Sequence, residues 1–311
     1  MPSVDLYLRA AARENTERSY RSALQHFEST WGGLLPASAN SVAQYLAEQA
    51  AVLSLSTLQQ RLAALAYWHK EHGFPDPTKA QLVRKVLKGI RTLHPARQKQ
   101  ARPIQLEQLT QIDGWLVDAA ARAAQAGRRA DQLRHTRDRA LLLLGFWRGF
   151  RGDEITRLRI EHVDAVRGAG MTCFLAQSKG DREARGRTFK APALRTLCPV
   201  DAYLAWIALS GLSDGPVFRA VDRWGKLGAA GLHINSYVPL LRALFHAAGI
   251  ALAGDYSGHS LRRGFATWAT ARGWDLKTLM DYVGWRDVHS AMRYLDAADP
   301  FDGLRPEAPP A

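Results

Sequence analysis

Four short segments of the sequence hold side chains that could grip a phosphate group and move a proton. They are residues 149–155, 178–181, 258–264 and 284–295. Together they supply arginine, lysine, histidine, tryptophan and tyrosine. Arginine can donate to two phosphate oxygens at once, and histidine or lysine can transfer a proton. A tyrosine hydroxyl can act as a nucleophile.

The first segment contains Arg151 and Glu154, three residues apart and just after the apolar run 141–147. On a helix this spacing puts both side chains on one face, where they can contact each other. The pair could also be an ordinary surface ion pair, which contributes little to stability. Arg148 is a weaker alternative to Arg151, because Glu154 is correctly spaced from Arg151.

The second segment places Lys179 at a predicted hairpin turn. A lysine there is usually a solvated turn residue, but its long side chain could also reach a neighbouring cleft as a proton donor. The polar residues 181–187 leave the register of the hairpin open, so Lys190 competes for this role.

The third and fourth segments place polar side chains on predicted helices. His259 and Arg262 lie three residues apart near a helix start, where the helix N-terminus favours an anion. A lone histidine is more often structural. The pairing with Arg262 makes a functional role for His259 as plausible as a structural one. Tyr294 follows Trp285 by nine residues, and taken alone it would be a packing residue.

The order and spacing of the four segments change this interpretation. Arginine, lysine, His-x-x-Arg and Trp-x8-Tyr resemble the active-site series of the tyrosine recombinases, also called the phage integrase family. Residues 257–294 especially resemble the Cre-like members, because Trp285 stands where most relatives have a second histidine. The resemblance extends to the plan of the chain, with a helical N-terminal domain, a basic linker and a catalytic domain.

This resemblance implies covalent chemistry on DNA. Tyr294 would attack the scissile phosphate, form a 3′-phosphotyrosyl link and free a 5′-hydroxyl. Arg151 and Arg262 would hold the non-bridging oxygens, where negative charge is stabilised in the transition state. Because one ester replaces another, the bond energy is conserved and the reverse attack can reseal the strand.

The resemblance also implies the supporting roles. Lys179 would protonate the departing 5′-oxygen, and His259 would be a hydrogen-bonding or general-base partner. Trp285 would donate one hydrogen bond while its ring packs the tyrosine in place. Glu154 would orient Arg151 or a neighbour. We expect no cofactor and no metal site, since the sequence has no Walker-type glycine loop or clustered carboxylates.

The elements that must position these residues suggest two domains and a linker. Residues 1–93 are predicted to form a helical core-binding (DNA-binding) domain, since apolar residues recur at helical spacing between short polar connections. The first of its four helices is expected to open near 15–17 and the second to span 41–53. The third is expected to follow a cap at Ser56, and the fourth to span 78–90. The basic linker 94–103 carries Arg97, Lys99 and Arg102, which could be solvated or lie along a DNA backbone.

Residues 104–298 would form the catalytic domain and 299–311 a C-terminal tail. The tail contains four prolines, so a stable helix over its whole length is not expected. The fold class is mainly α with a small β-sheet (α+β). Two short strands are expected at 171–177 and 187–190. Helices are expected at 106–126, 136–147, 151–159, 199–210, 236–248, 260–272, 276–283 and 288–295.

Composition agrees with a polyanionic partner. Lys and Arg outnumber Asp and Glu by 42 to 29, which gives a net charge of +13. Cationic side chains that neutralise phosphates release condensed counterions. Cys173 and Cys198 form no CxxC pair, so a reducing compartment is the simplest expectation. No apolar run suits a membrane span, and we expect a cytoplasmic, nucleoid-associated protein.

The sequence therefore predicts a site-specific DNA recombinase for integration, excision or resolution. It would act on a double-stranded DNA recombination site as a homo-oligomer, a tetramer on two sites, with an accessory protein left open. Two alternatives remain: a type IB topoisomerase-like relaxing enzyme, which uses the same kind of residues, and a non-catalytic DNA-binding protein with the same fold. Supercoil relaxation without a specific sequence would favour the topoisomerase.

Overall fold

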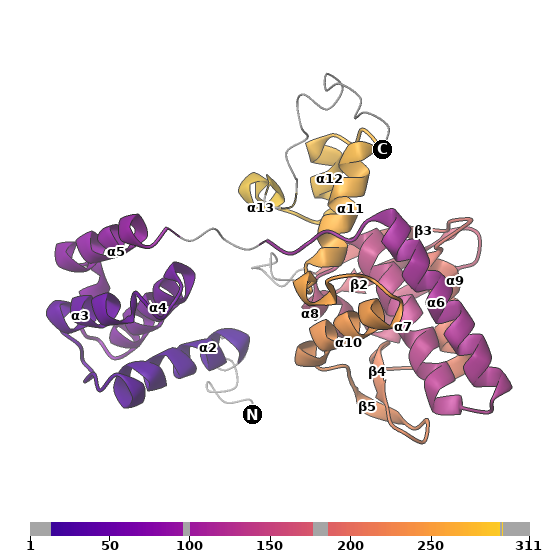
Figure 1. Ribbon diagram of the computed structural model, residues 1–311, viewed down its shortest axis with the longest axis horizontal. Helices are drawn as coiled ribbons and strands as arrows, with labels where there is room; N and C mark the ends of the chain where they lie inside the picture. The colour runs from indigo at the N-terminus through magenta and orange to yellow at the C-terminus, as the bar shows by residue number, and fades with distance from the viewer. Residues whose placement is uncertain (1–13, 96–99, 177–185, 293, 295–311) are drawn as a thin grey trace, which may run out of the picture. The chain divides into compact units, whose positions relative to one another are not determined.

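The computed structural model describes residues 14–95, 100–176, 186–292 and 294. The chain divides into two compact units, Met1–Lys99 and Gln100–Ala311 (Figure 1). Arg97, Lys99 and Lys179 lie outside the described residues, as does the tail after Tyr294. The limits expected for the core-binding domain, the linker, the catalytic domain and the tail remain predictions.

The described part of the first unit is helical. Its helices are α2 (Glu14–Gln25), α3 (Ala39–Gln49), α4 (Leu55–Glu71) and α5 (Gln81–Leu93), with a π-helical turn at His26–Thr30 and a 3-10 turn at Pro77–Lys79. Phe27, Tyr45, Leu46 and Leu58 are fully buried between them. Burial of one apolar stripe per helix is what the helical spacing predicted.

Three helix starts in this unit differ from the expectation, and the first is that of α3, which begins at Ala39 after the Ser38 cap rather than at 41. Helix α4 begins after Ser54 rather than Ser56, because the Ser54 hydroxyl accepts the hydrogen bond from the Thr57 amide at 3.2 Å. Helix α5 begins at Gln81, later than expected. The Asp76 carboxylate caps the 3-10 turn Pro77–Lys79 instead and delays the helix.

The second unit is built around α7 (Arg129–Arg148). Every residue from Ala140 to Arg148 is buried, and even Trp147 is only 7% exposed. A helix that is apolar all round in this way belongs in the middle of a core. The other helices are α6 (Leu106–Gln125), α8 (Gly152–Thr156), α9 (Pro199–Ser210), α10 (Ile234–Ala247), α11 (Ser260–Ala271), α12 (Leu276–Val283) and α13 (Val288–Met292).

A small antiparallel sheet lies in the same unit, in the order β1-β2-β3. Its strands are β1 (Val163–Val166), β2 (Gly170–Leu175) and β3 (Arg187–Pro192). In the register, Cys173 faces Phe189 and Thr172 faces Lys190. Because side chains alternate along a strand, Phe189 and Ala191 are buried while Lys190 is exposed.

A second pair of strands, β4 (Arg219–Val221) and β5 (Leu227–Gly231), forms a separate hairpin. The sequence analysis missed this hairpin and β1. Glycine and alanine fill most of β5, and these residues are depleted in strands, so neither composition nor alternation revealed it. The expected fold class is confirmed: the unit is mainly helical with a small sheet. Within the described ranges no helix is both long enough and apolar enough to cross a membrane.

Candidate active site

The turn between α7 and α8 presents Arg151. Gly149 ends α7 in the left-handed conformation, with φ 57°, and redirects the chain. Arg151 then has an extended backbone and precedes α8. The sequence analysis had expected it to lie on the helix. Its backbone amide and its Nη1 donate to the two oxygens of Glu154, at 2.8 and 2.7 Å. Since Glu154 is 4% exposed, this is a buried carboxylate and not a surface ion pair.

Arg262 approaches the same carboxylate from α11. Its side chain is fully buried, and Nη1 donates to the Gly149 carbonyl at 2.6 Å and lies 3.8 Å from Glu154 Oε2. Burial lowers the pKa of Arg262 to about 10, and repulsion by Arg151 acts in the same direction while Glu154 opposes it. Nε and Nη2 of Arg262 are buried and have no hydrogen-bond partner among the described residues.

His259 stands at the start of α11 and contacts the tyrosine. Ser257 and Ser260 shape this start, because the Ser257 amide donates to the Ser260 hydroxyl at 2.9 Å. The His259 amide donates to the Ser257 hydroxyl at 3.2 Å. The Nδ1 atom of the exposed His259 ring lies 3.0 Å from the Tyr294 hydroxyl, at hydrogen-bond distance. A hydroxyl beside a group that can accept its proton is the arrangement that covalent catalysis requires.

Trp285 packs against both the tyrosine and the buried arginine. Its ring is 4% exposed and stacks on Tyr294, with centroids 5.1 Å apart and an interplanar angle of 27°. The Arg262 guanidinium carbon lies 5.0 Å from the Trp285 ring and 5.5 Å from the Tyr294 ring. The indole N–H is buried without a hydrogen-bond partner in the described part of the chain. Tyr294 itself follows α13 in a turn, since the helix ends at Met292.

The structure therefore gathers six of the residues singled out from the sequence. They are Arg151, Glu154, His259, Arg262, Trp285 and Tyr294. Arg102 is described, but none of the contacts among the described residues joins it to this group: its side chain is exposed and its guanidinium lies 5.9 Å from the Tyr256 ring.

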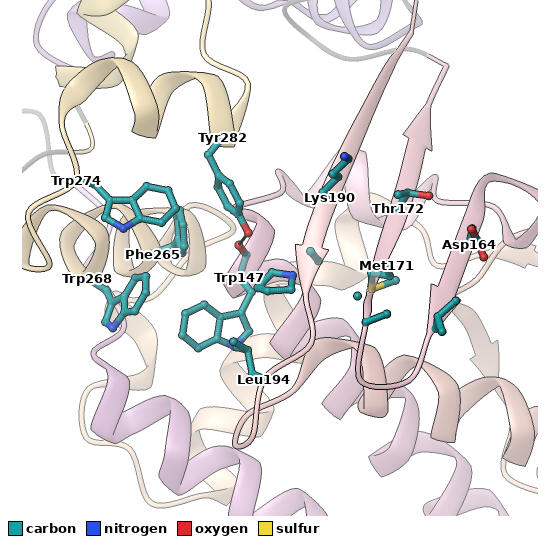
Figure 2. Close-up of a pocket in the computed structure, with 15 residues that line it drawn as sticks. Trp147, Asp164, Met171, Thr172, Lys190, Leu194, Phe265, Trp268, Trp274 and Tyr282 are labelled. Atoms are coloured by element: carbon teal, nitrogen blue, oxygen red, sulfur yellow. Dashed lines mark hydrogen bonds between the residues drawn. The ribbon is translucent and has the colours of Figure 1, made fainter.

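The two competing residues are placed elsewhere. Lys190 lines a cavity of about 640 Å³ whose other walls include Trp147, Trp268 and Tyr282, and none of the six gathered residues lines it (Figure 2). Arg148 is 1% exposed and donates to two backbone carbonyls, those of Lys190 and Tyr282. Arg151, and not Arg148, holds Glu154.

One basic surface escaped the sequence analysis. Helix α5 has no Asp or Glu, and its Arg84, Lys85, Lys88 and Arg91 are all exposed. The signal was present in the sequence, because a basic amphipathic helix has basic residues at helical spacing opposite buried Val83 and Ile90.

A sequence model of the Phage integrase family matches residues 118–300, which include all six gathered residues. The chain belongs to the phage integrase family. It is therefore a tyrosine recombinase, a member of a family of enzymes that cleave and rejoin DNA, as its resemblance implied.

Two relatives match most of the chain. It is 28% identical over 272 residues to an integrase/recombinase xerD homolog of Selenomonas ruminantium, covering 86% of this chain and 76% of the relative. It is 26% identical over 284 residues to the recombinase cre of Escherichia phage P1, covering 86% and 78%.

Solved structures share the fold. The Tn1549 transposon integrase in complex with transposon right end DNA superimposes with a TM-score of 0.59 at 14% identity, covering 94% of this chain and 93% of that one. The XerH site-specific recombinase bound to difH substrate gives a TM-score of 0.58 at 18% identity, covering 89% and 76%.

Proposed function

We propose that this tyrosine recombinase cuts and rejoins a specific double-stranded DNA site through a 3′-phosphotyrosyl link to Tyr294. The observation that carries the assignment is the hydroxyl of Tyr294 lying 3.0 Å from His259 Nδ1, beside the buried guanidinium of Arg262. The outcome in the cell would be integration, excision or resolution.

The scissile phosphate would be held by the donors that lack protein partners. Buried donors without an acceptor are costly, and Arg262 and Trp285 present three of them in the described structure. Non-bridging phosphate oxygens would satisfy these donors and receive the charge of Arg151, whose position Glu154 fixes. Charge that develops on the phosphate in the transition state would then meet preorganised cations.

The covalent step balances without a further reagent. A bond forms between the Tyr294 oxygen and phosphorus, and the bond from phosphorus to the 5′-oxygen breaks. The tyrosine proton passes to Nδ1 of His259, in the tautomer that leaves this nitrogen free to accept. Lys179 would supply a proton to the departing 5′-oxygen, and resealing runs the same steps backwards.

DNA binding would rest on phosphate contacts. The net charge of +13, the exposed basic residues of α5, and Arg97, Lys99 and Arg102 of the linker support this part of the proposal. Affinity should then fall steeply with salt, because each neutralised phosphate releases counterions. The active assembly would be a homo-tetramer on two sites, acting with the nucleoid in the cytoplasm, with or without an accessory protein.

The test is a search for a covalent protein–DNA adduct on a denaturing gel. Nicked suicide duplexes drawn from DNA flanking the gene are incubated with the full chain, with and without chelator. We expect an adduct that survives chelator and is lost in Tyr294→Phe. Tyr256→Phe is the matched control, because the Tyr256 hydroxyl is buried and has no hydrogen-bond partner in the described structure.

An adduct that persists in Tyr294→Phe would overturn the assignment of the nucleophile. Tight site-specific binding without an adduct would favour a DNA-binding protein that retains the fold. Relaxation of supercoiled DNA with no preference for sequence would favour the topoisomerase alternative.

A further inference from the structure

Two arginines meet the C-terminal end of α12, the helix that leads into Trp285 and Tyr294. Arg148 Nη2 donates to the Tyr282 carbonyl at 2.5 Å, and Arg187 Nη2 donates to the Asp281 carbonyl at 2.7 Å. Carbonyls in the last turn of a helix have no partner within the helix, and the helix dipole favours cations there. We call Arg148 and Arg187 the arginine cap of α12.

Arg148 is buried without an ion-pair partner among the residues that the structure describes. It is 1% exposed, and no carboxylate of the described residues forms an ion pair with it. Its guanidinium instead lies 3.9 Å from the ring centroid of Tyr282 and 5.0 Å from that of Phe189. Its Nη1 donates to the Lys190 carbonyl at 2.9 Å. Burying a charge with only carbonyl and ring partners is costly, so the position calls for a function that offsets the cost.

The two members of the cap come from segments that hold other parts of the site. Arg148 ends α7 three residues before Arg151. Arg187 opens β3, and Lys179 falls in the sequence between β2 and β3. One guanidinium thus ties the end of α12 to the Arg151 turn, and the other ties it to the hairpin.

The chain after α12 is packed closely enough for this anchoring to reach the nucleophile. Gly284 ends the helix at φ 81°, and a Cβ at this position would lie 2.9 Å from Phe189 Cε1 on β3. The next residue is Trp285, whose amide donates to the Met280 carbonyl at 2.9 Å and whose ring stacks on Tyr294. A shift at the end of α12 would therefore move the ring that orients the nucleophile.

We propose that Arg148 and Arg187 are positioning residues, which fix the segment carrying Trp285 and Tyr294 relative to Arg151 and to the β2–β3 hairpin. The inference rests on the proposed role of Tyr294 as the nucleophile. Neither arginine needs to touch DNA for this role.

The test compares cleavage with binding in the full chain. The variants are Arg148→Met, Arg187→Met and Arg187→Lys, and the rate of adduct formation is measured on suicide duplex with all DNA bound. Misplacing a reacting group by about 1 Å can cost on the order of 100-fold, so we expect losses of roughly 10- to 100-fold for both methionine variants. Dissociation constants for the DNA site should stay within about twofold, because only positioning has changed.

Arg187→Lys is the rescue variant. An ammonium group can still donate to the Asp281 carbonyl, so this variant should recover most of the rate lost in Arg187→Met. Arg134→Met is the matched control: Arg134 lies on the same helix α7 and also donates to two backbone carbonyls, those of Val221 and Asp222 in the β4–β5 hairpin. It should cleave at the natural rate.

A second readout does not depend on activity. Amide hydrogen exchange of residues 284–292 in the free protein should become faster in Arg187→Met than in the natural chain or in Arg134→Met. Unchanged exchange in this segment would overturn the positioning role of Arg187, even if no adduct forms at all. Faster exchange together with a missing adduct would count against the proposed function alone. Normal cleavage rates in both methionine variants, or equal losses in Arg134→Met, would also overturn it. If Arg148→Met fails to fold, the comparison of Arg187→Met with Arg187→Lys decides.

Discussion

Replacing Glu154 by glutamine tests the carboxylate that Arg151 and Arg262 share. Glu154 accepts from the amide and the guanidinium of Arg151, and its Oε2 lies 3.8 Å from Arg262 Nη1. Glutamine keeps the shape but turns one acceptor oxygen into a donor NH₂ group. Whichever way the amide is oriented, one Arg151 donor would face another donor.

The magnitude follows from the burial of the carboxylate. Hydrogen bonds to charged groups contribute about 1.5–3 kcal/mol each, and removing one partner of a buried ion pair costs about 3–5 kcal/mol. We therefore expect Glu154→Gln to lower the free energy of unfolding by about 3 kcal/mol. Adduct formation should slow as well, because Arg151 would no longer be held toward the phosphate.

The assay is urea unfolding of the full chain, with Asp153→Asn as the control. Asp153 immediately precedes Glu154 and pairs with Arg157 at 2.8 Å, but both side chains are substantially exposed. Exposed pairs contribute about 0–1 kcal/mol, so the control should lose less than about 1 kcal/mol. Equal losses in the two variants would refute the conclusion that Glu154 is a buried counter-charge for the site.

Three further outcomes are expected. Trp285→Phe keeps the stack on Tyr294 but removes the indole N–H. Losing one hydrogen bond of about 1.4 kcal/mol should slow adduct formation about tenfold, while DNA affinity, measured in parallel, should stay unchanged. Lys88→Gln on α5 should weaken DNA binding evenly across sequences and reduce the slope of log affinity against log salt by about 1, whereas an unchanged slope would remove α5 from the DNA contact. Burial raises the pKa of the Cys173 thiol to about 12, so the thiol stays protonated at pH 8 in the folded state. Iodoacetamide should therefore label Cys173 only in denaturant, as mass spectrometry would show.

Helices with strong end signals were predictable from sequence. Helices α9 and α12 have the expected limits, Pro199–Ser210 and Leu276–Val283. Proline in the first turn and a left-handed Gly211 fix the ends of α9. The Asp275 cap and a left-handed Gly284 fix those of α12.

Short elements were harder because tertiary packing decides them. Residues 151–159 were expected to continue as a helix, but α8 ends at Thr156. Leu158 instead accepts a hydrogen bond from the Val217 amide, and Ile160 donates to the Gly215 carbonyl. Partners more than 50 residues away leave no local periodicity to read.

Spacing predicted which residues of the site belong together, but it could not predict their contacts. The His-x-x-Arg pair suggested two side chains on one face of a helix. In the structure His259 is exposed and reaches Tyr294, whereas Arg262 is fully buried and reaches Gly149. The difference arises because the first turn of α11 packs against the end of α7. That packing joins residues over 100 positions apart in the sequence.

The contacts of Arg148 could not be predicted from the sequence either, and they bear on the electrostatics of the site. In the sequence it was a weaker alternative to Arg151, because Glu154 is correctly spaced from Arg151. In the structure Arg148, Arg151 and Arg262 lie in one region of the fold, but Glu154 is the carboxylate that pairs with the last two. Burial is the main cause that lowers the pKa of Arg262; repulsion from Arg151 and Arg148 acts in the same direction, and Glu154 opposes it. Carbonyl and ring partners thus accommodate Arg148 as a third cation near the site, and no carboxylate in the described ranges pairs with it. The site retains an excess of positive charge that an anionic phosphate would neutralise.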